Sequence, residues 1–162
     1  MPGKFAMGWV NTMALSAVLA GFGGQANLAS AADVSSGPAA SERLANARKA
    51  IDAKDWSRAL FELNQAVRDE PRNADAYNLL GYTYRKRPAP DLAKAFEHYN
   101  TALKLNPSHK GAHEYIGEAY LADKKPAEAE KHLAQLETIC GNKTCEEYAD
   151  LFKSIADYKS KN

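Results

Sequence analysis

Apolar residues recur at every third or fourth position from about Ser41 to Tyr158, which places them on one face of an α-helix. Leu60, Leu63 and Val67 follow this spacing in one stretch. No stretch of this region alternates apolar and polar residues as a half-buried strand does. The pattern therefore predicts helices throughout the region.

Helix-breaking residues divide this region into segments that are each about a dozen residues long. The breaks lie at Lys54-Asp55, Pro71, Pro88-Ala89-Pro90, Asn106-Pro107, Lys125-Pro126 and Gly141. Short connections between helices favour antiparallel neighbours. We therefore expect successive antiparallel helix pairs.

The segments repeat at a nearly constant period. Ala95 and Ala129 lie 34 residues apart, whereas Gly81 and Gly117 lie 36 residues apart. Periods of this length are typical of stacked helical repeats. We place the two extra residues of the longer period in the turn 86–90, because a loop tolerates an insertion and prolines stiffen it.

Each unit has small and aromatic residues in the same order. The second unit contains Tyr77-x-x-Leu80-Gly81-x-x-Tyr84, Ala95-x-x-x-Tyr99, Ala102 and Pro107, and the third contains His113-x-x-Ile116-Gly117-x-x-Tyr120 and Ala129-x-x-x-Leu133. The first matches in Asp55-Trp56, Ala59-x-x-x-Leu63, Ala66 and Pro71. These patterns resemble the tetratricopeptide repeat (TPR) family.

The resemblance implies an all-α fold, a right-handed superhelix of three TPR helix-turn-helix repeats plus a C-terminal capping helix. We place this domain at 41–160, with repeats at about 40–73, 74–109 and 110–143 and the capping helix at about 145–159. The small residues allow helices to approach closely, and we interpret the tyrosines beside them as packing residues.

The start of the last helix has its own local pattern. Thr144 precedes Cys145-Glu146-Glu147, which predicts that Thr144 caps this helix. Tyr148, Leu151 and Ile155 then form an apolar stripe suited to cover the last repeat.

The first 32 residues differ in kind from the remainder. A single cation at Lys4, an apolar run from Met13 to Phe22 and small residues at Ala29-Ser30-Ala31 predict a secretory signal peptide at 1–32. The apolar run is too short to span a membrane, so we expect cleavage before Ala32 or Asp33 and no membrane insertion afterwards. Residues 33–40 are expected to form a flexible linker. These features predict a periplasmic or secreted protein.

Net charge narrows the class of partner. The chain has 21 Lys and Arg against 20 Asp and Glu, a formal net charge of +1. Such a balance provides no long-range attraction to nucleic acid or to an anionic membrane. We therefore expect a protein or peptide partner and no nucleic acid. Because three repeats suffice for a stable single chain, we also expect a monomer.

Cys140 and Cys145 are the two cysteines of the chain. In an exported protein such a pair most simply forms a structural disulfide, here between the last repeat and the capping helix. A redox-active pair remains the alternative, although catalytic thiols are usually spaced as Cys-x-x-Cys.

The sequence contains no recognisable catalytic motif or metal-ligand set. His109 and His113 could share one helix face, but His113 stands where the family buries an aromatic residue and His109 lies in a turn. We therefore predict a non-enzymatic protein with no catalytic residues, no metal and no cofactor.

The remaining surface is the concave groove that stacked first helices form. The TPR register assigns to it Leu44, Arg48, Ile51, Asn78, Tyr82, Arg85, Lys86, Glu114, Glu118 and Leu121. We select Arg48, Asn78, Tyr82, Arg85, Glu114 and Glu118 as partner-binding residues. A basic sector at Arg48 and Arg85 would meet an acidic sector at Glu114 and Glu118, which suits a peptide with charges of both signs.

Some TPR domains bind chaperone tails through a clamp of Lys and Asn residues around a terminal carboxylate. Leu44, Leu79 and Tyr115 stand at three of the clamp positions here, so this specificity is not expected. We predict a protein-interaction module, an adaptor or assembly factor of the bacterial cell envelope. The alternatives are a helper in envelope redox or cytochrome biogenesis that uses the cysteine pair, and a thiol-disulfide or hydrolytic enzyme.

Overall fold

The structure is a computed structural model that describes residues 39–161. The predicted signal peptide and residues 33–38 of the predicted linker lie outside the described residues. Over the described range the chain forms helices and no strands, namely α1 (Ala40–Asp52), α2 (Trp56–Asp69), α3 (Ala74–Lys86), α4 (Leu92–Leu105), α5 (Lys110–Ala122), α6 (Pro126–Cys140) and α7 (Glu146–Lys161). The predicted all-α fold is confirmed, and α1 begins at Ala40, the last residue of the predicted linker.

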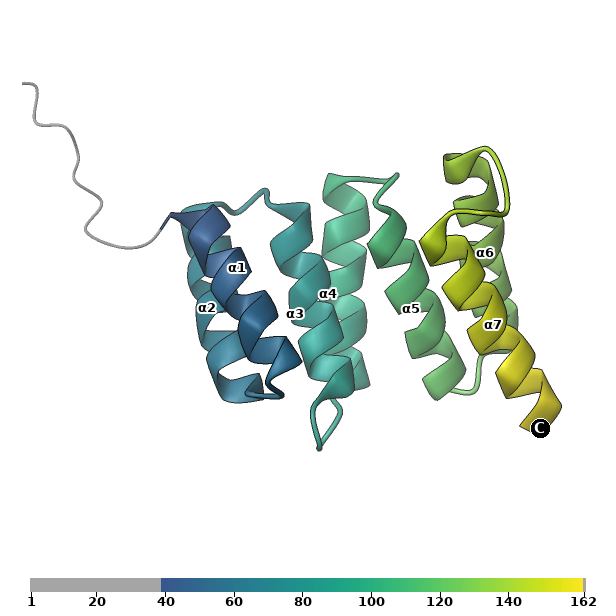
Figure 1. The fold of residues 1–162 in the computed structure, drawn as a ribbon, viewed down its shortest axis with the longest axis horizontal. Coiled ribbons are helices and arrows are strands. Elements are labelled where there is room, and N and C mark those ends of the chain that lie inside the picture. Colours follow the sequence, from purple (N-terminus) through teal and green to yellow (C-terminus); the bar gives the residue numbers. More distant parts are fainter. Residues whose placement is uncertain (1–38, 162) are drawn as a thin grey trace, which may run out of the picture. The chain divides into compact units, whose positions relative to one another are not determined.

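Consecutive helices pack as antiparallel pairs, α1 with α2, α3 with α4 and α5 with α6 (Figure 1). Each pair stacks on the next through α2 against α3 and α4 against α5. The last helix, α7, packs on both α5 and α6, where the first helix of a further pair would lie. It therefore covers the end of the stack, as a capping helix should.

Polar side chains fix where four of the helices begin. Asp55, Asn73, Asp91 and His109 directly precede α2, α3, α4 and α5, and each accepts a hydrogen bond from the backbone N–H three residues later, at 3.0 or 3.1 Å. These bonds satisfy backbone donors that the helix itself leaves unpaired. The sequence thus encodes the helix boundaries locally.

The turn within each pair shows where the long repeat gains its two residues. In the first and third pairs, the residue before the second helix donates a backbone hydrogen bond to the carbonyl five positions earlier, at 2.8 Å. In the second pair, Asp91 donates to Tyr84, seven positions earlier, at 2.9 Å. Lys54 and Lys124 adopt the left-handed conformation in the shorter turns. The predicted insertion in the turn 86–90 is therefore confirmed.

Glycine at two inner positions lets neighbouring side chains touch the helix backbone. A Cβ atom built on Gly81 would lie 2.6 Å from the ring of Tyr99, which is completely buried. A Cβ atom on Gly117 would lie 2.6 Å from Cδ2 of Leu151, which is also completely buried. The second contact fixes the capping helix on the third repeat.

The start of α7 differs from the prediction. The hydroxyl of Thr144 donates a hydrogen bond to Oδ1 of Asn142 at 2.8 Å, and the Thr144 backbone N–H donates to the same oxygen. Thr144 therefore stabilises the loop between α6 and α7, and its predicted role as the helix cap is wrong, because α7 begins only at Glu146.

A disulfide joins Cys140, the last residue of α6, to Cys145, directly before α7. Gly141 ends α6 in the left-handed conformation, with φ of 68°. Cys145 packs against the core that α7 forms with α5 and α6. The bond thus lies at the junction between the last repeat and the capping helix.

None of the helices between residues 39 and 161 combines the length and the apolar character that crossing a membrane requires.

The contact between Gly81 and Tyr99 predicts a specific loss of stability. Gly81→Ala should lower the free energy of unfolding by about 1 to 3 kcal/mol, because the added methyl group would lie 2.6 Å from the completely buried Tyr99 ring and force it to shift. Chemical denaturation followed by circular dichroism measures this change. The control Asn100→Ala changes an exposed residue of α4 and should shift stability by less than about 0.5 kcal/mol. Equal stability of Gly81→Ala and the unmodified protein would contradict the packing described here.

Candidate functional site

The six predicted groove residues all lie on α1, α3 and α5, but their environments differ. Arg48 is exposed, whereas Asn78 and Glu114 are only 6% and 9% exposed. Leu44 and Leu121, which the register also assigned to the groove, are buried in the core. The groove surface is therefore smaller than the register alone suggests.

Arg48 and Tyr82 line the same cavity between α1 and α3, which has a volume of about 230 Å³. Leu79 and Tyr115 contribute apolar and aromatic surface to it. The rings of Tyr82 and Tyr115 lie 4.9 Å apart between centroids. Burial raises the pKa of Tyr115 to about 12, so its hydroxyl keeps its proton at neutral pH. The cavity thus offers a cation beside two phenol rings.

Arg85 is bound within the groove by residues of the protein itself. Its guanidinium forms an ion pair with Glu118 at 2.5 Å, and its Nε donates to the Tyr99 hydroxyl at 3.3 Å. Burial alone would lower the pKa of Arg85, but Tyr99 and Glu118 outweigh burial and raise it. The guanidinium also lies over the rings of Tyr82 and Tyr115, 5.5 and 5.9 Å from their centroids.

Glu118 is shared between three helices. Its Oε2 accepts from Arg85 on α3, and its Oε1 accepts a hydrogen bond from the hydroxyl of Ser154 on α7 at 3.2 Å. The predicted basic and acidic sectors therefore neutralise each other where they meet. A ligand would have to displace this pair to use either residue, so the accessible charges lie on both sides of it.

Glu114 lies where α5 faces α7. Its burial is the main cause that raises its pKa, to about 8, and the carboxylates of Glu118, Asp150 and Glu147 raise it further. Glu114 is therefore largely protonated at neutral pH, and this end of the groove is surrounded by carboxylates.

The side chain of Asn78 does not lie where it could hold a ligand. Its Oδ1 is buried and has no hydrogen-bond partner among the described residues. Its side-chain nitrogen lies close to Gly111 at the start of α5, where an added Cβ would come within 3.2 Å. The side chain is therefore packed between α3 and α5 rather than presented to the groove.

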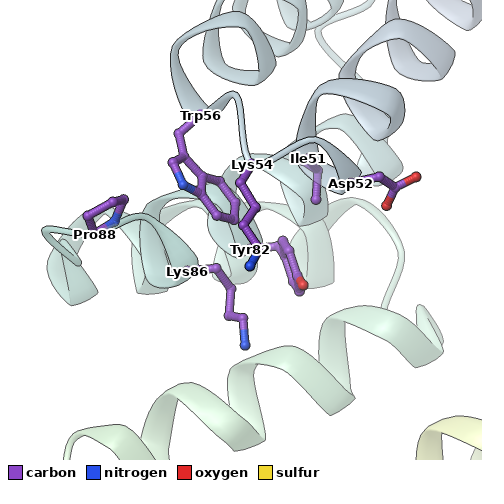
Figure 2. Close-up of a pocket in the computed structure, with 7 residues that line it drawn as sticks. All are labelled: Ile51, Asp52, Lys54, Trp56, Tyr82, Lys86 and Pro88. Atoms are coloured by element: carbon purple, nitrogen blue, oxygen red, sulfur yellow. The ribbon is translucent and has the colours of Figure 1, made fainter.

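A second cavity beside the first was not predicted from the sequence. It has a volume of about 520 Å³ and is lined by Ile51, Asp52, Lys54, Trp56, Tyr82, Lys86 and Pro88 (Figure 2). The register assigns Ile51, Tyr82 and Lys86 to the groove. In the sequence, Lys54 is notable only as part of a turn and Trp56 only as a match to the repeat pattern. Trp56 and the enlarged turn are the signals in the sequence that could have drawn attention to this place.

The histidines form structural contacts. His113 contacts His132 through their Nδ1 atoms at 2.9 Å and the carbonyl oxygen of Pro107 through its Nε2, also at 2.9 Å. Burial and the neighbouring His113 lower the pKa of His132 to about 4, and burial also lowers the pKa of His113, so both rings pack without charge at neutral pH. His109 caps α5 and contacts Asp75 at 3.0 Å.

One group of potential metal ligands occurs between residues 39 and 161. The sulfur atoms of Cys140 and Cys145 lie near the carboxylate of Glu147. The two sulfurs are bonded to each other, so they are not thiolate ligands in this state. Neither cysteine lines either cavity between α1 and α3.

The raised pKa of Glu114 predicts an unusual pH dependence. The unfolded chain releases this proton near pH 4.5 and the folded protein near pH 8, so stability falls as pH rises across this range. Glu114→Gln removes the effect and should raise the free energy of unfolding at pH 8 by more than about 1 kcal/mol, after allowance for solvent screening. Denaturant titrations between pH 5 and about pH 8 measure the difference.

Glu97→Gln on the exposed face of α4 is the matched control, because it removes one carboxylate far from this cluster. Parallel stability curves for Glu114→Gln and the unmodified protein would contradict the raised pKa.

Comparison with known proteins identifies the repeat. The sequence matches the tetratricopeptide repeat family over residues 44–97 and 91–142. No curated protein matches the chain.

Several solved structures share the fold. The TPR2B domain of yeast Sti1, solved as a complex with pHsp70, superposes with a TM-score of 0.67 at 17% identity, covering 76% of this chain and 98% of that one. The first TPR of Spaghetti (RPAP3), bound to the HSP90 peptide SRMEEVD, has a TM-score of 0.65 at 19% identity, with coverages of 75% and 95%. The first TPR domain of human RPAP3 gives 0.61 at 18% identity, with coverages of 76% and 97%.

At these identities the superpositions establish the fold alone, whereas the family match extends over more than half of the sequence. With the helix pairs, the buried glycines and the capping helix, it shows that this protein belongs to the tetratricopeptide repeat family.

Proposed function

We propose that this protein is an adaptor or assembly factor of the bacterial cell envelope, which binds an extended segment of another protein in the groove formed by α1, α3 and α5. The observation that supports this proposal best is the open cavity between α1 and α3, lined by Arg48, Tyr82 and Tyr115. Arg48 forms no ion pair with any other residue of 39–161, so it is available to a ligand.

A binding function agrees with the mode of action of related folds. Two of the superposed TPR domains were solved as complexes, one with pHsp70 and one with an HSP90 peptide. Leu44 is buried in the core here and Leu79 and Tyr115 offer no cation, so we propose that the groove does not hold a terminal carboxylate as the chaperone-tail clamp does. The protein would act by binding, as a monomer and without a catalytic step.

Site-specific crosslinking in cells tests this function. A photoreactive amino acid at Tyr82 should capture a defined partner, whereas the same amino acid at Asn100, exposed on the outer helix α4, should not. Arg48→Glu should reduce capture at Tyr82 by at least about tenfold, since charge reversal at a binding surface acts directly on the partner. The same proteins captured at both positions, or capture unaffected by Arg48→Glu, would exclude the groove as the binding site.

We also propose that the chain is exported and that Cys140 and Cys145 form their disulfide in the oxidising compartment. The proposal rests on the pattern of residues 1–32 and on the position of the bond between α6 and α7. A disulfide there would hold the capping helix against the third repeat.

N-terminal sequencing of the purified native protein should then begin at Ala32 or Asp33. Thiol titration in denaturant should find no free thiol before reduction and both thiols afterwards. An intact Met1 together with two free thiols would overturn the proposal for export.

A further inference from the structure

The larger cavity between α1 and α3 has a composition that the rest of the groove lacks. Lys54 lies in the turn after α1, and Trp56 is the first residue of α2 (Figure 2). Tyr82 and Lys86 lie on α3, and Pro88 lies in the enlarged turn. The two-residue insertion of the second repeat therefore helps to build one wall of this cavity.

The charge of the cavity is positive. Lys54 and Lys86 form no ion pair with another residue of the described range, and Figure 2 shows the Asp52 carboxylate pointing away from both ammonium groups. The neighbouring cavity, which shares Ile51, Asp52 and Tyr82 with this one, adds the guanidinium of Arg48. An anionic group placed between the two lysines would thus meet uncompensated positive charge.

The walls of the cavity are aromatic. Trp56 and Tyr82 are both half-buried, so each ring shows part of its surface to a ligand. Aromatic surface beside a cation suits a ligand with an apolar or aromatic group next to an anion. At the opposite end of the groove, the carboxylates of Glu147 and Asp150 near Glu114 would repel such an anion.

We propose that this cavity binds an acidic side chain of the partner segment, with an adjacent aromatic or aliphatic side chain packed on Trp56. The inference rests on the proposed function and states the chemistry of the partner at this position. This cavity and its neighbour share Ile51, Asp52 and Tyr82, which gives a bound segment a path past the acid on one side. We therefore place the acid on an internal residue, and a free terminal carboxylate is the alternative that the experiment tests.

Tryptophan fluorescence provides a direct readout. The chain has two tryptophans, and Trp9 lies outside the described residues, so Trp9→Phe in the full chain leaves Trp56 as the only reporter. The probe is a short acetylated and amidated peptide that contains Asp-Phe-Glu between Gly and Ser residues. This peptide should change Trp56 emission and bind at least about tenfold more tightly than the matched peptide with Lys in place of both acids.

Two substitutions test the lysines without disturbing the fold. Lys54 has a φ of 57°, and Lys54→Asn keeps a residue that tolerates this conformation while removing the charge. Lys54→Asn and Lys86→Gln should each weaken binding of the acidic peptide by about three- to tenfold and reduce its salt dependence. Lys104→Gln on the exposed face of α4 is the control and should leave binding unchanged. Circular dichroism verifies that each variant is folded.

The outcomes separate the two proposals. Binding of peptides without preference for acids, or binding unaffected by Lys54→Asn and Lys86→Gln, overturns this inference but leaves the groove as a peptide site. A requirement for a free C-terminal carboxylate, tested with the non-amidated peptide, overturns the internal position of the acid. If neither these peptides nor the partner captured through Tyr82 bind the purified protein, the proposed function fails as well.

Discussion

The stack depends on close contact between helices at positions that hold glycine or alanine. Ala59, Ala95 and Ala129 occupy the same place in the second helix of each pair, and all three are completely buried. Gly81 similarly accepts the Tyr99 ring directly against its helix backbone. One helix pair cannot cover its own apolar face, so the small residues let neighbouring pairs bury it together.

Packing between the helices leaves the inner faces of α1, α3 and α5 free to carry polar and aromatic side chains. Arg85 and Glu118 use this surface to join α3 to α5, and Ser154 extends the connection to α7. The pair stabilises the groove and neutralises its centre. Charge that a ligand could meet is thereby restricted to the two ends, basic between α1 and α3 and acidic between α5 and α7.

A TPR scaffold determines the form of a surface and not the identity of a ligand. Specificity in this chain must therefore come from features that interrupt the regular repeat. The enlarged turn with Pro88 is such a feature, and it lies at the larger cavity. The proposed acidic partner segment would contact this turn together with the half-buried rings of Trp56 and Tyr82.

Helical spacing, caps and prolines act over a few residues. The order of amino acids alone was therefore enough to predict the helices, the repeat period and the turn that holds the insertion, although not the residue at which α7 begins. Three features became visible only in the folded chain. Arg85 forms an ion pair with Glu118, which is 33 residues later in the sequence. The side-chain Oδ1 of Asn78 is buried, and the Thr144 hydroxyl donates a hydrogen bond to Asn142 in its own loop. The register correctly placed the groove residues on the inner helices but could not show which were available to a ligand. Ion pairing and burial depend on the distances between helices. Those distances are determined jointly by side chains that lie far apart in the sequence.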